Sequence, residues 1–221
     1  MLNVSQSCQI KNLADIYDKY LKPLDGGVFV EIGAYDGESF SNTSCLADIG
    51  WRGVYVEPVE EFYNKCKKRH SHNNVTVLNN SVGSVEGEFQ VYVAGCITTT
   101  KLSQLEMYRD VNWLKGRNQR EEKCLQITLE QVLKTNSISP NFDLLVVDVE
   151  GSEVDVFNSF SLASWRPRML IVELEDTHST FLKYTEHREA HKVLRKAIID
   201  TGYTEVYKDS INTVFVNKSS V

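Results

Sequence analysis

Residues 29–37 read FVEIGAYDG, and they carry the clearest structural signal in the chain. An apolar run ends at Ile32, two glycines follow four residues apart, and a helical pattern begins near Ser39. Glycine permits a tight turn and a close approach of the backbone to a ligand, and the first turn of a helix offers free N–H groups. In open α/β sheets, ligands bind at such strand ends. The stretch therefore predicts an α/β fold with a ligand-binding turn.

The charge of this turn indicates the ligand. A pyrophosphate-binding turn has the pattern G-x-G-x-x-G, whereas this one reads G-x-x-x-G from Gly33 to Gly37 and carries Glu31 and Asp36. The two carboxylates would repel a diphosphate, but they suit a cationic ligand. Because S-adenosylmethionine carries an ammonium and a sulfonium group, the turn favours this compound over NAD.

Short apolar runs alternate with helical segments along the rest of the chain, which predicts βα units and a mostly parallel sheet. We expect one Rossmann-like α/β domain over residues 1–221, with a seven-stranded sheet, helices on both faces and a C-terminal antiparallel hairpin. Strands are predicted at 27–32, 53–57, 75–78, 87–93, 125–127, 142–147, 168–174, 203–207 and 213–216, and helices at 13–21, 39–49, 59–68, 128–135, 153–160 and 188–201. The final hairpin favours the methyltransferase variant of this fold.

The segment 94–123 does not follow the alternation. It is polar and has no clear period, although it contains Tyr108 and Trp113. Long irregular insertions in compact domains are usually lids or binding loops, so this segment is expected to bind substrate; an unordered surface excursion is the alternative. The two aromatic side chains could stack on a sugar or serve packing alone.

Composition argues against several classes of protein. The net charge of −6 is unfavourable for a nucleic-acid partner held by phosphate contacts, and the basic run at 65–69 is typical of a helix C-terminus. No apolar stretch approaches the roughly 20 residues that span a bilayer, and the N-terminus lacks the apolar run of a signal peptide. The five cysteines have no CxxC spacing and are expected to be free. These features indicate a cytoplasmic location.

Acidic residues also follow the later predicted strands. Glu57 ends the second strand, where a carboxylate can accept hydrogen bonds from ribose hydroxyls; a solvated carboxylate is the alternative. Asp148, Glu150 and Glu153 crowd the end of the most apolar strand. Like charges raise the pKa of neighbouring carboxyl groups, which suits a general base or a metal ligand. Glu153 also suits a helix N-terminus.

Three segments in this order resemble the FkbM family of methyltransferases. They are FVEIGAYDG at 29–37 with the trailing SNT at 41–43, GWRGVYVEP at 50–58, and DVEGSE at 148–153. ITL at 127–129 and IVE at 171–173 follow the same pattern. The resemblance implies a class I methyltransferase fold, S-adenosylmethionine as the methyl donor, and typically a hydroxyl acceptor on a sugar, a glycan unit or a natural product.

The resemblance also implies the role of single residues. Glu31 and the glycine turn would line the methionine half of the cofactor, Ser41 or Thr43 would bind its carboxylate, and Glu57 would hold the ribose. The complete expected cofactor site is Glu31, Gly33, Ala34, Tyr35, Asp36, Gly37, Ser41, Thr43, Glu57, Pro58, Asn80, Ser81, Val82 and Asp148.

A sugar hydroxyl is a poor nucleophile, so we expect a base to assist it. Asp148 and Glu150 are the first candidates, and His178, shortly after the strand predicted at 168–174, is the second. A divalent metal is a possible further cofactor. Asp148 with Glu173, Glu175 or Asp176 is the set of oxygen ligands that would suit Mg²⁺.

Two other classes match parts of the sequence. Tyr63 and Lys67 form the Tyr-x-x-x-Lys pair of short-chain dehydrogenases, but they follow the second strand, too early to meet a nicotinamide. A non-catalytic glycan-binding module would not need Glu31, Gly33 and Glu57 together. We therefore expect an O-methyltransferase that acts on a sugar or glycan and releases S-adenosylhomocysteine, with a small natural product as the alternative acceptor.

Overall fold

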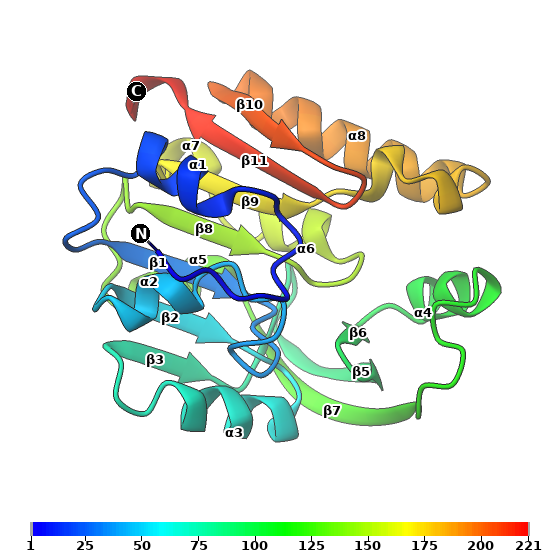
Figure 1. Ribbon diagram of the computed structural model, residues 1–221. Helices are drawn as coiled ribbons and strands as arrows, with labels where there is room; N and C mark the ends of the chain where they lie inside the picture. Colours follow the sequence, from blue (N-terminus) through cyan, green and yellow to red (C-terminus); the bar gives the residue numbers. More distant parts are fainter. Residues whose placement is uncertain (1, 221) are drawn as a thin grey trace.

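The main sheet has seven strands, in the order β10-β11-β9-β8-β1-β2-β3 (Figure 1). The computed structural model describes residues 2–220. The strands are β1 (Val28–Ile32), β2 (Arg52–Val56), β3 (Val75–Leu78), β8 (Leu144–Val147), β9 (Met169–Glu173), β10 (Tyr203–Lys208) and β11 (Asn212–Asn217). The first five are mutually parallel, whereas β11 is antiparallel to both β9 and β10. The predicted Rossmann-like sheet with its C-terminal hairpin is confirmed.

Helices cover both faces of this sheet because successive strand residues point to opposite sides. One face buries Val30 and Leu145 against one set of helices, and the other buries Phe29 and Val146 against a second set. The first set is α5 (Leu129–Thr135), α6 (Glu153–Phe157), α7 (Leu162–Trp165) and α8 (Thr185–Asp200), and the second is α1 (Leu13–Tyr20), α2 (Ser44–Asp48) and α3 (Glu60–Arg69). Within residues 2–220, no helix has the length and apolar character needed to cross a membrane.

Helix α2 is shorter than the helix predicted at 39–49. Phe40 adopts a left-handed φ of 62°, and the Ser41 hydroxyl accepts hydrogen bonds from the N–H groups of Thr43 and Ser44. Side-chain bonds to nearby backbone groups compete with helix formation. These residues therefore form a turn at the edge of the sheet, and the helix begins only after it.

A second sheet extends past the carboxyl ends of the parallel strands, as Figure 1 shows; it contains the strands predicted at 87–93 and 125–127, but the sequence did not predict that they form a separate sheet. Its strands are β4 (Ser81–Val82), β5 (Gly87–Ala94), β6 (Ile97–Thr99) and β7 (Arg120–Ile127), in the order β4-β7-β5-β6, and α4 (Leu102–Asp110) lies between β6 and β7. The expectation that 94–123 is irregular was therefore wrong. Its order comes from the long-range pairing of β5 with β7 and from an apolar cluster that includes Leu105, Tyr108 and Phe181.

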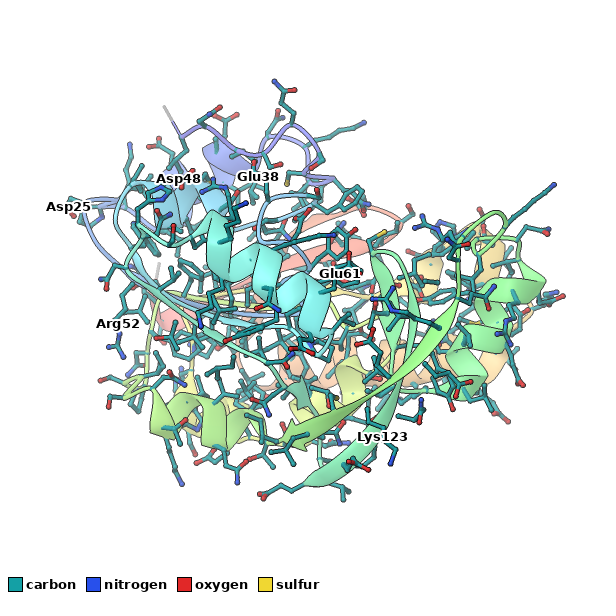
Figure 2. The ribbon with its side chains drawn as sticks, turned by 90° about the horizontal axis from the view of Figure 1, so that it is seen from below. Asp25, Glu38, Asp48, Arg52, Glu61 and Lys123 are labelled. Carbon is teal, nitrogen blue, oxygen red and sulfur yellow. The ribbon has the colours of Figure 1, made fainter. Side chains whose placement is uncertain are left out.

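The second sheet is attached to α3. Phe62 on α3 packs in one apolar cluster with Val91, Val93 and Cys124 of the second sheet. Arg120 of β7 lies 3.1 Å from Glu61, which Figure 2 shows at the end of α3 nearest to this sheet. Exposed ion pairs contribute little to stability, so the apolar cluster is the main attachment.

The end of β1 lies very close to the loop after β8. The N–H groups of Gly33 and Ala34 donate to the Val56 carbonyl at 3.0 and 3.1 Å, and the Asp148 N–H donates to the Ile32 carbonyl at 3.0 Å. Gly33 has a left-handed φ of 91°, and a Cβ atom there would lie 1.7 Å from the Asp148 carbonyl oxygen. Glycine therefore allows β1, β2 and β8 to end together at one edge.

Gly33→Ala should destabilise the protein more than Gly50→Ala. Gly50 has a similar φ of 93°, but a Cβ atom there meets nothing within 4 Å, so its replacement measures the cost of the left-handed backbone alone, about 1–2 kcal/mol. Gly33→Ala adds an overpacking cost of about 1–3 kcal/mol. Chemical denaturation of both variants gives the free energies of unfolding, and equal losses would contradict the close contact.

Candidate active site

A cavity of about 400 Å³ lies at the carboxyl ends of β1, β2, β8 and β9 and reaches the second sheet. Most of the residues predicted for the site line it: Glu31, Gly33, Ala34, Tyr35, Ser41, Glu57, Pro58, Asn80, Ser81, Val82, Asp148 and Glu150. Asp36, Gly37, Thr43 and His178 are outside this lining. The topology thus brings together side chains that are more than a hundred residues apart in the sequence.

Glu31, on β1, is a buried carboxylate in the cavity wall. The Thr43 hydroxyl donates a hydrogen bond to it, and the Ser41 hydroxyl lies 3.4 Å from the same oxygen. Burial raises the pKa of Glu31 to about 7, although the hydrogen bond from Thr43 opposes the shift. Thr43 is fully buried, so it holds Glu31 in place, whereas Ser41 reaches the cavity itself.

Asp36 and Gly37 shape the turn without lining the cavity. The Asp36 carboxylate accepts hydrogen bonds from the N–H groups of Glu38 and Ser39 at 3.0 and 2.7 Å. Gly37 has a φ of 77°, and a Cβ atom on it would lie 2.9 Å from the His70 ring. The sequence correctly predicted the turn, but these two residues fix the shape of its backbone and do not line the cavity.

Glu57 directly follows β2, and only 3% of its surface is exposed. Its two carboxylate oxygens accept hydrogen bonds from the N–H groups of Tyr35 and Val59, each at 2.9 Å. Burial raises the pKa of Glu57 to about 8, although these hydrogen bonds oppose the shift. A carboxylate oxygen has two lone pairs, so both oxygens can still accept a hydrogen bond from a ligand hydroxyl.

Three carboxylates, Asp148, Glu150 and Glu173, gather at the ends of β8 and β9. These strands pair in parallel with Val147 opposite Val172, so the next residues, Asp148 and Glu173, come side by side. One oxygen from each of the three lies within 4.8 Å of the other two. Burial raises the pKa of Asp148 to about 6. Burial and the charge of Asp148 raise the pKa of Glu150 and of Glu173 well above the usual value.

Glu153 supports the loop that carries two of these carboxylates. It begins α6, as predicted, but it is fully buried. Its Oε1 accepts hydrogen bonds from the N–H groups of Val149 and Gly151 at 3.1 and 3.2 Å, and its Oε2 lies 3.3 Å from His191 Nε2. Burial would raise the pKa of Glu153, but the hydrogen bond and charge of His191 lower it. Glu153 therefore stays ionised and fixes the loop.

Glu175 and Asp176, considered as partners of Asp148, are engaged elsewhere. Glu175 Oε2 lies 2.9 Å from His187 Nε2, and Asp176 accepts hydrogen bonds of 3.1 and 2.6 Å from Arg195. Burial would raise the pKa of Asp176, but the guanidinium lowers it. Of the three expected partners, Glu173 is the one that joins Asp148, and Glu150 completes the group.

The far wall of the cavity comes from the second sheet and its connections. Thr98, Thr99 and Thr100 line it at β6, and Trp113 and Arg117 line it from the connection between α4 and β7. The sequence analysis named Trp113 but not the other four. A polar segment without a hydrophobic period does not indicate which of its side chains face a cavity. The run of three threonines was the one available signal. Hydroxyls, a guanidinium and an aromatic ring thus face the acidic edge of the main sheet.

His178 lies behind Trp113, and this placement does not favour the predicted role as a base. Its ring packs edge-on against Trp113 with ring centroids 5.3 Å apart. Its Nδ1 accepts a hydrogen bond from the Thr180 N–H at 3.2 Å. His178 follows the 3-10 turn Glu175–Thr177 and does not line the cavity. Proximity in sequence to a strand end was therefore a poor guide here.

The dehydrogenase alternative also fails on placement. Tyr63 and Lys67 lie on the exposed surface of α3, where Lys67 Nζ is 3.2 Å from the Tyr63 hydroxyl. Neither residue lines the cavity. The Tyr-x-x-x-Lys pattern is an ordinary contact between successive turns of a helix.

Comparison with known proteins identifies the family. The FkbM methyltransferase domain matches residues 31–204, which include the turn at Gly33, Glu57 and the three-carboxylate group. The chain belongs to the FkbM methyltransferase family. This match confirms the resemblance found in the three sequence segments. The comparison with curated proteins gives no match.

Solved methyltransferase structures share the fold of this FkbM family member. An O-methyltransferase from Bacillus cereus in complex with S-adenosylhomocysteine is 14% identical, with a TM-score of 0.52 over 97% of this chain and 85% of that chain. Magnesium protoporphyrin IX methyltransferase from Synechocystis PCC 6803, also with bound S-adenosylhomocysteine, is 13% identical, with a TM-score of 0.50 over 93% and 82%. These likenesses confirm the class I methyltransferase fold.

Glu57→Gln should change how the stability of this family member depends on pH. The folded protein keeps the Glu57 proton up to about pH 8, whereas a glutamate in the unfolded chain releases it above about pH 4.3. Between these values the folded state binds more protons, so the free energy of unfolding falls as the pH rises. Glutamine does not titrate, so the variant lacks this contribution.

Between about pH 5 and pH 8, the wild type should therefore lose more than about 1 kcal/mol relative to Glu57→Gln, since a tenfold change in proton affinity is worth about 1.4 kcal/mol. Urea denaturation of both proteins at the two pH values measures this change. The variant also loses one hydrogen-bond acceptor, which lowers its free energy of unfolding by the same amount at every pH. If the difference in free energy of unfolding between the wild type and Glu57→Gln is the same at both pH values, the raised pKa of Glu57 is contradicted.

Proposed function

We propose that this protein transfers the methyl group of S-adenosylmethionine to a hydroxyl oxygen of a sugar or glycan unit. The observation that carries the proposal is the division of one cavity into two chemically different parts. The part beside β1 and β2 presents Glu31, Glu57 and the glycine turn. The part between β8, β9 and the second sheet presents carboxylates, threonine hydroxyls and Trp113. The donor occupies the first part and the acceptor the second.

Charge and hydrogen bonding support S-adenosylmethionine as the donor. Glu31 supplies negative charge for the ammonium group, and Glu57 supplies acceptors for the ribose hydroxyls. Residues 80–82 line the cavity together with Glu57 and provide a wall for the adenine. NAD suits the site less well, because its diphosphate would lie beside carboxylates in an environment that screens charge poorly. Membership of a methyltransferase family points in the same direction.

The reaction requires alignment of two reactants and the removal of one proton. The hydroxyl oxygen attacks the methyl carbon, the carbon–sulfur bond breaks with its electrons going to sulfur, and S-adenosylhomocysteine leaves. The sulfonium already makes the methyl group electrophilic, so alignment supplies much of the acceleration. Asp148 is the proposed base, with Glu150 beside it. A pKa of about 6 leaves Asp148 able to accept the proton near neutral pH.

The second sheet supports a carbohydrate acceptor. Trp113 offers an aromatic ring with an apolar face and a polar edge, and Thr98, Thr99 and Thr100 offer hydroxyl groups beside it. Residues 94–123 are therefore the proposed acceptor-binding element of a single domain. A small natural product with a hydroxyl near an apolar ring is the second candidate for the same wall. We also propose a cytoplasmic location, on the cysteine pattern of the sequence.

S-adenosylhomocysteine should bind and stabilise the protein, and NAD should not. At a concentration of 100 times the dissociation constant, the stabilisation is about 2.7 kcal/mol, which a thermal shift detects. Titration calorimetry of Glu57→Ala should show a loss of about 1–3 kcal/mol in binding, whereas Gly50→Ala should bind as the wild type does. Stabilisation by NAD without stabilisation by S-adenosylhomocysteine would overturn the proposed donor.

Trp113→Ala should weaken the use of the acceptor and leave the donor site intact. A mass-spectrometric screen of sugars, glycans and hydroxylated natural products first identifies the acceptor by the gain of one methyl group on oxygen. With that acceptor, the variant should raise KM by about 3- to 10-fold, the equivalent of one aromatic contact. Its affinity for S-adenosylhomocysteine should stay within about twofold, which checks the fold. An unchanged KM would remove Trp113 from the acceptor site.

A further inference from the structure

The three carboxylates at the ends of β8 and β9 form a compact group that methyl transfer does not by itself explain. One base is sufficient to remove the acceptor proton, yet Asp148, Glu150 and Glu173 each direct an oxygen to the same place, within 4.8 Å of one another. All three line the cavity. They come from two adjacent strands and one loop, so the group depends on the fold and not on a local acidic run.

The backbone is bent to bring Glu150 into this group. Glu150 has a left-handed φ of 53° and Gly151 one of 93°. A left-handed conformation costs a residue with a side chain about 1–2 kcal/mol, and it persists where the surroundings impose it. Here Glu153 imposes it, because its buried carboxylate holds the N–H groups of Val149 and Gly151. The loop is thus held in a shape that concentrates negative charge.

Among the described residues, no Lys, Arg or His side chain forms an ion pair with these three carboxylates. Glu173 is 5% exposed, and its Oε2 has no hydrogen-bond partner among the residues that the structure describes. Two cations near the loop are committed elsewhere. Lys101 Nζ lies 2.9 Å from Asp155 Oδ2 and donates to the Gly151 carbonyl at 3.1 Å, and Arg117 donates to backbone carbonyls of its own segment. Buried carboxylates without compensation are costly.

A second buried group near these carboxylates also lacks a partner. The Tyr108 side chain is fully buried, and within the described part of the chain its hydroxyl makes no hydrogen bond. Burial, followed by the charges of Glu150 and Glu173, raises the pKa of Tyr108, so the hydroxyl lies within the field of the carboxylates.

The spacing of the oxygens fits one hard cation. Ligand oxygens on opposite sides of an ion are separated by twice the metal–oxygen distance, about 4.2 Å for Mg²⁺ and about 4.6–5.2 Å for Ca²⁺. The three oxygens lie within 4.8 Å of one another, so they are close enough to bind the same ion. Carboxylate oxygens are the ligands that these ions prefer, and the ions take six or more of them. Three protein oxygens therefore leave at least about three positions for water or acceptor oxygens.

We propose that Asp148, Glu150 and Glu173 bind one divalent cation of the Mg²⁺, Mn²⁺ or Ca²⁺ type in the acceptor part of the cavity. The cation would bind the Glu173 oxygen that has no hydrogen-bond partner in the described structure, and it would offer open positions to oxygens of the acceptor. It would lower the pKa of a bound hydroxyl. This inference deepens the proposed function, but the binding of a cation can be tested without an acceptor.

The test is a Mn²⁺ titration of the metal-free protein, followed by electron paramagnetic resonance, with Mg²⁺ and Ca²⁺ as competitors. The wild type should bind one Mn²⁺ with a dissociation constant on the order of 100 μM or lower. Glu173→Gln should weaken this binding by about 10- to 100-fold, because it replaces a carboxylate ligand with a neutral amide. It should remain folded, because glutamine has nearly the same size and Glu173 Oε2 makes no hydrogen bond that the variant would lose.

Glu175→Gln is the matched control. Glu175 is also buried and also has an oxygen without a partner in the described structure, but it lies outside the group of three. Its replacement should change Mn²⁺ affinity by less than about fivefold, through charge alone. Equal losses in the two variants, or the absence of a saturable site below about 1 mM in the wild type, would overturn the proposal. S-adenosylhomocysteine binding to the same samples tests the proposed function separately, so each can fail alone.

Discussion

The close contact between Gly33 and the Asp148 carbonyl is the constraint on which the rest of the site depends. A Cβ atom at Gly33 would lie 1.7 Å from that oxygen, so β1 and β8 end at the same level because residue 33 has no side chain. The shared level brings Glu31, Asp148 and Glu173 to one edge of the sheet. If β1 and β8 ended at different levels, these three carboxylates would not lie at the same edge of the sheet.

The second constraint is electrostatic. The cavity wall holds five carboxylates, Glu31, Glu57, Asp148, Glu150 and Glu173, and burial raises the pKa of each of them. Such an arrangement lowers the stability of the empty protein and favours cationic ligands. The sulfonium and ammonium of the proposed donor and the proposed divalent cation are charges of the required sign. The stability of the protein and the affinity of its site are therefore linked.

The sequence predicted those parts of the structure that depend on local pattern. The Gly33 turn, Glu57 and Asp148 were placed correctly because parallel strands end at a common edge. The second sheet was missed because β5 pairs with β7 over a long loop, and Thr98 to Thr100 and Arg117 were missed with it. His178 was misplaced because a 3-10 turn follows β9. The support from Glu153 and the joining of Glu150 to Glu173 depend on tertiary contacts that no spacing reveals.

The central claim is that the cavity at the ends of β1 and β2 binds the methyl donor. Hydrogen exchange with and without S-adenosylhomocysteine tests it most directly, since it locates the ligand on the backbone. We expect slower exchange of the amides at 33–36, 57, 59 and 80–83, with β10 and β11 unchanged. Protection confined to the outer surface of α3 and β7, or no protection at a saturating concentration of the ligand, would contradict the account.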